Sequence, residues 1–121
     1  MSQPIPVRVG YFYQMSGQGA SVIVAYPRTA DSTFNKDYYL STHMPLVKKH
    51  WTKHGLKSYA VTDLSSSDDA PYTYIVVMDF ESLEGFGAAA QDESIKEIMG
   101  DVDNFSNVKP VLLHGSVIGR G

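Results

Sequence analysis

The chain has 121 residues, of which 43% are hydrophobic and 19% are charged, and its formal net charge is -3. This length and composition are typical of one globular domain, and the slight negative charge disfavours the broad attraction to polyanions that nucleic-acid binding needs. The sequence has no cysteine, no apolar run of about 18 residues and no basic start followed by an apolar stretch, so we expect a cytoplasmic protein without disulfides, membrane anchor or nucleic-acid partner.

The first 19 residues are predicted to form an extension before the main domain, which covers residues 20–121. Apolar and other side chains alternate over residues 7–13, as in an extra strand, but Pro4 and Pro6 suit a flexible arm equally well. Residues 20–26 are apolar, rich in β-branched side chains and end at Pro27, which predicts the first strand of the main domain.

A helix is predicted over residues 33–53, where apolar side chains recur at mixed helical spacing and lysines gather in the last turns. Gly55 is well suited to end it. Pro45 interrupts the segment, because proline lacks an N–H and disfavours helical angles at Met44. We therefore expect either a kink or a second helix that starts at Pro45.

The second half of the chain predicts two more strands, a helical region and a last strand. Residues 56–63 and 72–80 read as strands, separated by an exposed loop over residues 65–69, and the second of them is apolar on both faces. Ser82 can cap a helix that runs to residue 90, and a second start at Asp92 continues to Gly100. Residues 110–118 form the predicted last strand.

This order of strand, helix, strand, strand, helix, strand is the ferredoxin-like βαββαβ arrangement, an α+β fold with a four-stranded antiparallel sheet. The first and third strands are the most apolar and should be central, whereas the second carries Lys57 and Asp63, as an edge strand should. Right-handed crossovers place both helices on one face of the sheet, so the other apolar face needs a cover. A second copy of the chain would supply it, and we expect a homodimer.

The candidate chemistry concentrates at Tyr39 and His43, which are four residues apart on one predicted helical face. An imidazole titrates near neutral pH and can move a proton, while a phenol can orient it or stabilise an oxyanion. The structural alternative is that His43 satisfies a backbone carbonyl freed by Pro45 and that Tyr39 packs in the core.

Two further residues are candidates for the wall of a pocket. His114 lies in the last strand and would complete a pocket if its face is interior, but a histidine in an edge strand is more often half exposed and inert. Asp79 ends an apolar strand, where burial would raise its pKa and make it a base, although a solvated strand end or a cap is the commoner role.

Metal, phosphate and RNA sites are not predicted. His50 and His54 are four apart, but the residues between them include no glutamate, and Lys49 and Lys53 would repel a cation. Gly17 and Gly19 precede a strand, whereas a phosphate-binding loop leads into a helix. RNA-recognition domains share the order of elements, but the third strand here lacks their basic residue and glycine. We expect no metal and no cofactor.

The sequence resembles the EthD family, which is named from a bacterial ether-degradation gene cluster. The motifs cover nearly all of residues 20–118 and are strongest from the paired tyrosines to the His-Met-Pro-Leu stretch. They are Tyr26-Pro27, Phe34, Asp37-Tyr38-Tyr39, His43-Met44-Pro45-Leu46, Gly55-Leu56, Ala70-Pro71-Tyr72, Phe80-Glu81-Ser82-Leu83 and Asn104-Phe105 before Pro110.

The resemblance implies a ferredoxin-like chain that pairs into a dimeric α+β barrel and binds a small hydrophobic or lactone-like organic molecule. The wider group includes cofactor-independent catabolic isomerases, dehydratases and oxygenases, and the family's histidine falls on His43. With His43 and Tyr39 as catalytic residues, the expected ligand pocket is formed by Tyr26, Phe34, Tyr38, Met44, Asp79, Phe105 and His114. The alternatives are a non-catalytic small-molecule-binding or accessory dimer module, and a haem-binding barrel that uses His114 or His43 as axial ligand.

Overall fold

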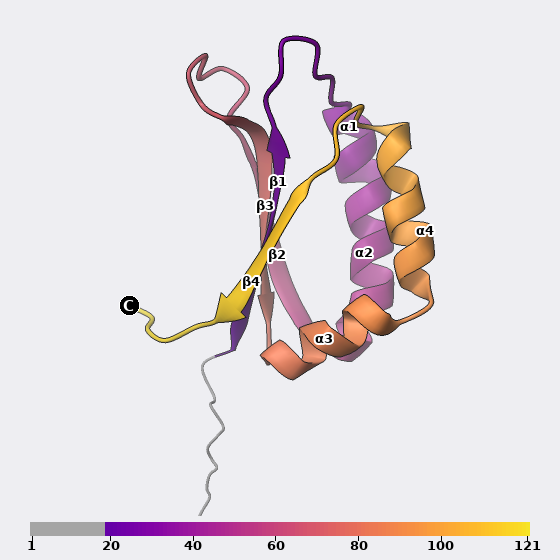
Figure 1. Ribbon diagram of the computed structural model, residues 1–121. Coiled ribbons are helices and arrows are strands. Elements are labelled where there is room, and N and C mark those ends of the chain that lie inside the picture. Colours follow the sequence, from indigo (N-terminus) through magenta and orange to yellow (C-terminus); the bar gives the residue numbers. More distant parts are fainter. Residues whose placement is uncertain (1–18) are drawn as a thin grey trace, which may run out of the picture.

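The computed structural model describes residues 19–121, so the predicted extra strand or arm before Gly19 lies outside the described part of the chain. Its sheet consists of β1 (Ala20–Pro27), β2 (Leu56–Asp63), β3 (Tyr72–Phe80) and β4 (Val111–Ser116), all antiparallel, in the order β2-β3-β1-β4. This is the predicted ferredoxin-like topology, with the two most apolar strands at the centre (Figure 1).

The helices lie together on one side of the sheet, as predicted (Figure 1). They are α1 (Lys36–Tyr38), α2 (Met44–Trp51), α3 (Leu83–Gln91) and α4 (Ser94–Gly100), with short π and 3-10 turns at Tyr39–His43, Thr52–His54 and Asp101–Asn104. Among the described residues, none of these helices has the length and apolar character needed to cross a membrane.

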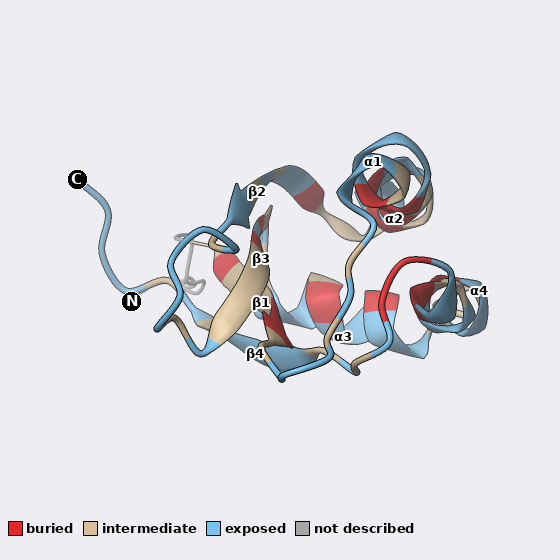
Figure 2. Ribbon diagram, turned by 90° about the horizontal axis from the view of Figure 1, so that it is seen from above, coloured by how far each residue is buried: buried red, intermediate tan, exposed pale blue. Residues whose placement is uncertain are grey.

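The strand register divides the side chains of the sheet between two faces. Val22 is paired with Met78, and these residues point towards the helices, where both are almost fully buried. The core therefore lies between the sheet and the helical layer, and Figure 2 shows the buried segments gathered there.

The opposite face of the sheet is also apolar. Ile23 pairs with Val77 on one side and with Leu113 on the other, so the three side chains form a row across this face. Val77 is 38% exposed and Leu113 is 53% exposed, because no helix of residues 19–121 covers them.

The expected break at Pro45 takes the form of a π-turn within a continuous helical path. Residues Tyr39–His43 are π-helical, and the Met44 N–H bonds to the carbonyl of Tyr39, one residue further back than in an α-helix. His43 and Met44 keep helical backbone angles, and α2 starts at Met44 with proline in its first turn. The widened turn thus accommodates the proline without ending the helix.

Helix α3 approaches the end of the first helical segment closely. The Ser82 hydroxyl accepts a hydrogen bond from the Gly85 N–H at 3.0 Å, which confirms the predicted cap. A methyl group at Gly85 would overlap the carbonyl oxygen of His54, whereas a methyl group at Gly87, in the same helix, would meet open space.

We expect opposite effects from adding one methyl group at these two positions. Gly85→Ala should lower the free energy of unfolding by roughly 1–3 kcal/mol, because a backbone oxygen cannot move aside as a side chain can. Gly87→Ala should raise it by roughly 0.5–1 kcal/mol through better helix propensity. Urea denaturation of both variants measures this, and equal stability of the two would contradict the described packing of α3.

Candidate functional site

The π-turn places His43 and Tyr39 against each other. Their rings stack with centroids 5.2 Å apart and planes at 20°, because residues four apart lie nearly above one another in a widened turn. The Phe105 ring covers another side of the imidazole at 4.5 Å. His43 is only 4% exposed, so its ring is held among aromatic side chains.

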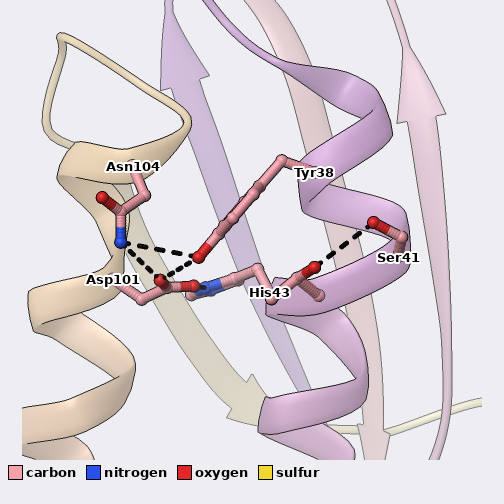
Figure 3. A network of polar contacts seen from close by, with 6 residues as sticks. Tyr38, Ser41, His43, Asp101 and Asn104 are labelled. Atoms are coloured by element: carbon pink, nitrogen blue, oxygen red, sulfur yellow. Dashed lines mark hydrogen bonds and ion pairs between the residues drawn. The ribbon is translucent and has the colours of Figure 1, made fainter.

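Asp101 is the polar partner of His43. Its Oδ2 lies 2.9 Å from Nδ1 of the imidazole, and its Oδ1 accepts hydrogen bonds from the Tyr38 hydroxyl at 2.6 Å and the Asn104 amide at 2.9 Å. Figure 3 shows these side chains converging between two helical segments, with Tyr38 and His43 on one and Asp101 and Asn104 on the other. The carboxylate is therefore fixed by three donors.

The charge states follow from burial and these bonds. Burial lowers the pKa of His43, and this outweighs the opposing effect of Asp101, so the imidazole is neutral at pH 7. Burial alone would raise the pKa of Asp101, but hydrogen bonds from Tyr38, Asn104 and His43 hold it below its usual value. A carboxylate can only accept, so Nδ1 of the neutral imidazole carries the proton and Nε2 keeps a free lone pair.

Tyr26 and Tyr39 are buried phenols on the sheet side of the site. Burial raises the pKa of both hydroxyls, and the interaction between them raises that of Tyr39 further and lowers that of Tyr26. The pKa of Tyr38 is raised chiefly by its hydrogen bond to Asp101. All three phenols remain protonated and are hydrogen-bond donors at neutral pH.

A cavity of about 100 Å³ lies between the sheet and the helices and is lined by Tyr39 and His43. The residues of the range 19–121 that line this cavity include no lysine, arginine, aspartate or glutamate. The remaining wall residues include Val24, Tyr26, Met44, Val47, Trp51, Val76, Met78, Phe86, Ile98 and Leu112. A neutral imidazole therefore lies on the wall of a small apolar chamber, an arrangement suited to taking a proton from a bound organic molecule.

Of the other residues predicted to form the pocket, some line this cavity or pack beside it, and others lie outside it. Tyr26 and Met44 lie on its wall, while Phe34 and Phe105 form an aromatic cluster with Tyr26 at ring distances of 5.0 and 5.7 Å. Tyr38 lies outside the cavity, bonded to Asp101.

Two residues that were predicted to line the pocket, His114 and Asp79, do not line the cavity. His114 is on the helical face of β4, where it is exposed and contacts the Phe86 ring at 5.1 Å. Asp79 pairs with Ser21 on the face turned away from the helices and forms ion pairs with Arg120 at 2.9 Å and Lys57 at 3.7 Å. Its carboxylate serves the sheet surface in this structure.

Sequence reasoning missed Asp101 and Trp51 as members of the site. Asp101 is 58 residues from His43, and its one local signal is an acid at the C-terminal end of α4, where the helix dipole disfavours negative charge. Trp51 is one of the apolar side chains of the helix predicted over residues 33–53, and its position in the sequence does not distinguish it from the others. Within residues 19–121 no three histidine or acidic side chains gather as metal ligands; His50 and His54 bond separate carboxylates, Glu97 and Asp92.

Comparison with known proteins gives a family and a set of similar folds. The EthD domain model matches residues 27–109. An EthD-like protein from Ralstonia eutropha JMP134 is 31% identical, with 86% of this chain and 96% of that chain covered and a TM-score of 0.73. An ethyl tert-butyl ether degradation family protein from Bacillus halodurans C-125 is 21% identical, with 83% and 99% covered and a TM-score of 0.63.

A more distant structure shares only the fold. A cofactor-independent oxygenase from Streptomyces nogalater is 8% identical, with 86% of this chain and 95% of that chain covered and a TM-score of 0.57. No curated protein matches the sequence. The domain match spans more than two thirds of the sequence and the relative from Ralstonia eutropha matches across nearly its whole length, so the chain belongs to the EthD family.

Proposed function

We propose that the protein is a cofactor-independent enzyme that removes a proton from a small, mostly apolar organic molecule bound between the helices and the sheet. The observation that carries this proposal is the 2.9 Å contact of His43 Nδ1 with Asp101, at the wall of the apolar cavity. This contact leaves Nε2 of His43 as a neutral nitrogen base. Such a base can begin a reaction by removing a proton from a bound molecule.

Each neighbour of His43 has a separate part in this mechanism. Asp101 fixes the tautomer and stabilises the imidazolium that forms when Nε2 takes a proton, while Tyr38 and Asn104 hold the carboxylate in place. Tyr39 orients the imidazole by stacking, and its protonated phenol can donate to negative charge on the substrate.

A protein of the same fold supports this class of reaction. The oxygenase from Streptomyces nogalater is described as cofactor-independent, so this fold can support a reaction that uses no cofactor. Isomerisation, dehydration and oxygenation without a cofactor can each begin with a base-promoted deprotonation of the substrate, which is the step assigned to His43.

The proposal predicts how the histidine titrates. Burial lowers the pKa of His43 and Asp101 opposes this, so its NMR titration midpoint should lie below 6.5, and Asp101→Asn should move it lower still. Asp92→Asn, which alters the partner of His54, should leave the His43 midpoint unchanged. A midpoint above 6.5, or one insensitive to Asp101→Asn, would remove the basis for the proposed base.

Turnover should depend on the same group. His43→Asn keeps an amide donor near Asp101 but has no titratable nitrogen, so we expect ligand affinity to remain while turnover falls by about 10²- to 10⁴-fold. The base acts unprotonated, so kcat/KM of the wild type should rise with pH through a pKa below 6.5 and stay level above it. The measurement uses a substrate found by screening small cyclic compounds, and full activity of His43→Asn would rule out this role.

We also propose that the protein is a homodimer formed through the apolar face of the sheet that the helices leave open. The row of Ile23, Val77 and Leu113 is the kind of surface that a second sheet would cover. Burial of this face against its own copy would close the two sheets into an α+β barrel.

Light scattering after size exclusion should give the mass of a dimer at micromolar concentration. Leu113→Lys should shift the mass to that of a monomer, because a charge would be buried at the centre of the contact. Leu40 is exposed to the same degree, 51% against 53%, but lies in the helical layer, so Leu40→Lys is the matched control and should remain dimeric. A monomeric wild type would exclude the barrel.

A further inference from the structure

Trp51 carries an unused hydrogen-bond donor within the core. The residue is 5% exposed, and its indole Nε1 is buried with no hydrogen-bond partner among residues 19–121. A buried N–H without an acceptor is rare in folded proteins, because the lost hydration is not replaced. The indole N–H therefore needs an acceptor that the described part of the chain does not provide.

The surroundings of the indole offer rings and aliphatic side chains. The indole lies against the rings of Phe80 at 5.9 Å and Phe86 at 6.0 Å, and neither side chain has an oxygen acceptor. Trp51 also lines the cavity that contains His43. A molecule bound in that cavity would therefore lie against the Trp51 side chain.

We propose that Trp51 is the second polar anchor of the site and that the ligand is a small, uncharged cyclic carbonyl compound. Its carbonyl oxygen accepts from Trp51 Nε1–H, while His43 Nε2 takes a proton from the carbon next to the carbonyl. This step rests on the function proposed for His43. The C–H bond breaks, the proton forms a bond to Nε2, and the electron pair moves onto the carbonyl oxygen as an enolate, which the indole N–H stabilises.

The cavity itself limits the ligand. Its volume of about 100 Å³ is of the same order as the roughly 150 Å³ of an apolar cavity that holds benzene, which limits the ligand to a single small ring of about the size of benzene. The absence of a charged side chain from the described wall disfavours a carboxylate or an ammonium group on the ligand. Cyclopentanone meets these conditions, and methylenecyclopentane has the same shape without the acceptor.

The first measurement uses the wild type, whose one tryptophan gives one indole N–H resonance in the NMR spectrum. Cyclopentanone should move this resonance downfield, and methylenecyclopentane should bind without the downfield shift. This experiment needs no variant, so it stands even if a change at Trp51 affects folding. Failure of cyclopentanone to bind, or binding without a downfield shift, overturns the proposal.

The second measurement compares two affinities in each protein by ligand-observed NMR. The ratio of the affinity for cyclopentanone to that for methylenecyclopentane should fall about five- to tenfold in Trp51→Phe, because one hydrogen bond to the carbonyl is lost. The two compounds differ in hydration, but this difference is the same for both proteins and cancels when their ratios are compared. In Asp92→Asn, a change outside the cavity wall, the ratio should stay as in the wild type. An unchanged ratio in Trp51→Phe overturns the assignment of the indole.

Exchange of the ring protons of cyclopentanone in D2O separates the two proposals. Catalysed exchange that His43→Asn abolishes, together with the indole shift, supports both. The indole shift without catalysed exchange supports the anchor and contradicts the proton-removing function. Catalysed exchange with no indole shift and an unchanged affinity ratio supports His43 as base and overturns the role of Trp51.

Discussion

The site depends on the hydrogen-bond donors that one partly buried carboxylate, that of Asp101, needs. The Asp101 side chain is 11% exposed and lies at the end of α4, where the helix dipole disfavours its charge, so it is stable as an anion only if the surrounding residues donate to it. Tyr38 and His43 come from the first helical segment and Asn104 from the turn after α4. Hydrogen bonds to a charged group contribute about 1.5–3 kcal/mol each, so this cluster ties the two helical segments together while it fixes the tautomer of the histidine.

The π-turn links this polar cluster to the apolar cavity. It lets the helix pass Pro45 and stacks His43 on Tyr39, so that one edge of the imidazole meets Asp101 while the ring borders the cavity. The helical face of the sheet completes the cavity with side chains such as Val76 and Met78, whose alternate neighbours supply the opposite apolar face. The same strands therefore serve the proposed site on one face and the proposed dimer contact on the other.

Much of the fold was predictable because it rests on local patterns. Alternation and turn residues predicted β2 and β3 with their observed limits, and the four-residue spacing predicted that Tyr39 and His43 would be neighbours. Contacts between distant segments were not predictable. Nothing near Asp101 in the sequence points to His43. The loop after β2 was expected only to be exposed, but Arg28 donates hydrogen bonds to its carbonyls, including those of Ala70 and Ser67. The alternation of side chains along β3 predicts that Asp79 and Met78 lie on opposite faces of the sheet. Which of these faces meets the helices depends on packing between distant segments.

The central claim is that Asp101 holds His43 as the neutral tautomer with its free nitrogen at Nε2. Nitrogen-15 NMR of the imidazole at pH 7 tests this most directly, because protonated and unprotonated ring nitrogens resonate far apart. The account predicts a proton on Nδ1 and none on Nε2 in the wild-type protein. A ring protonated on Nε2 alone, or on both nitrogens, would contradict it, since no lone pair would then be available at Nε2.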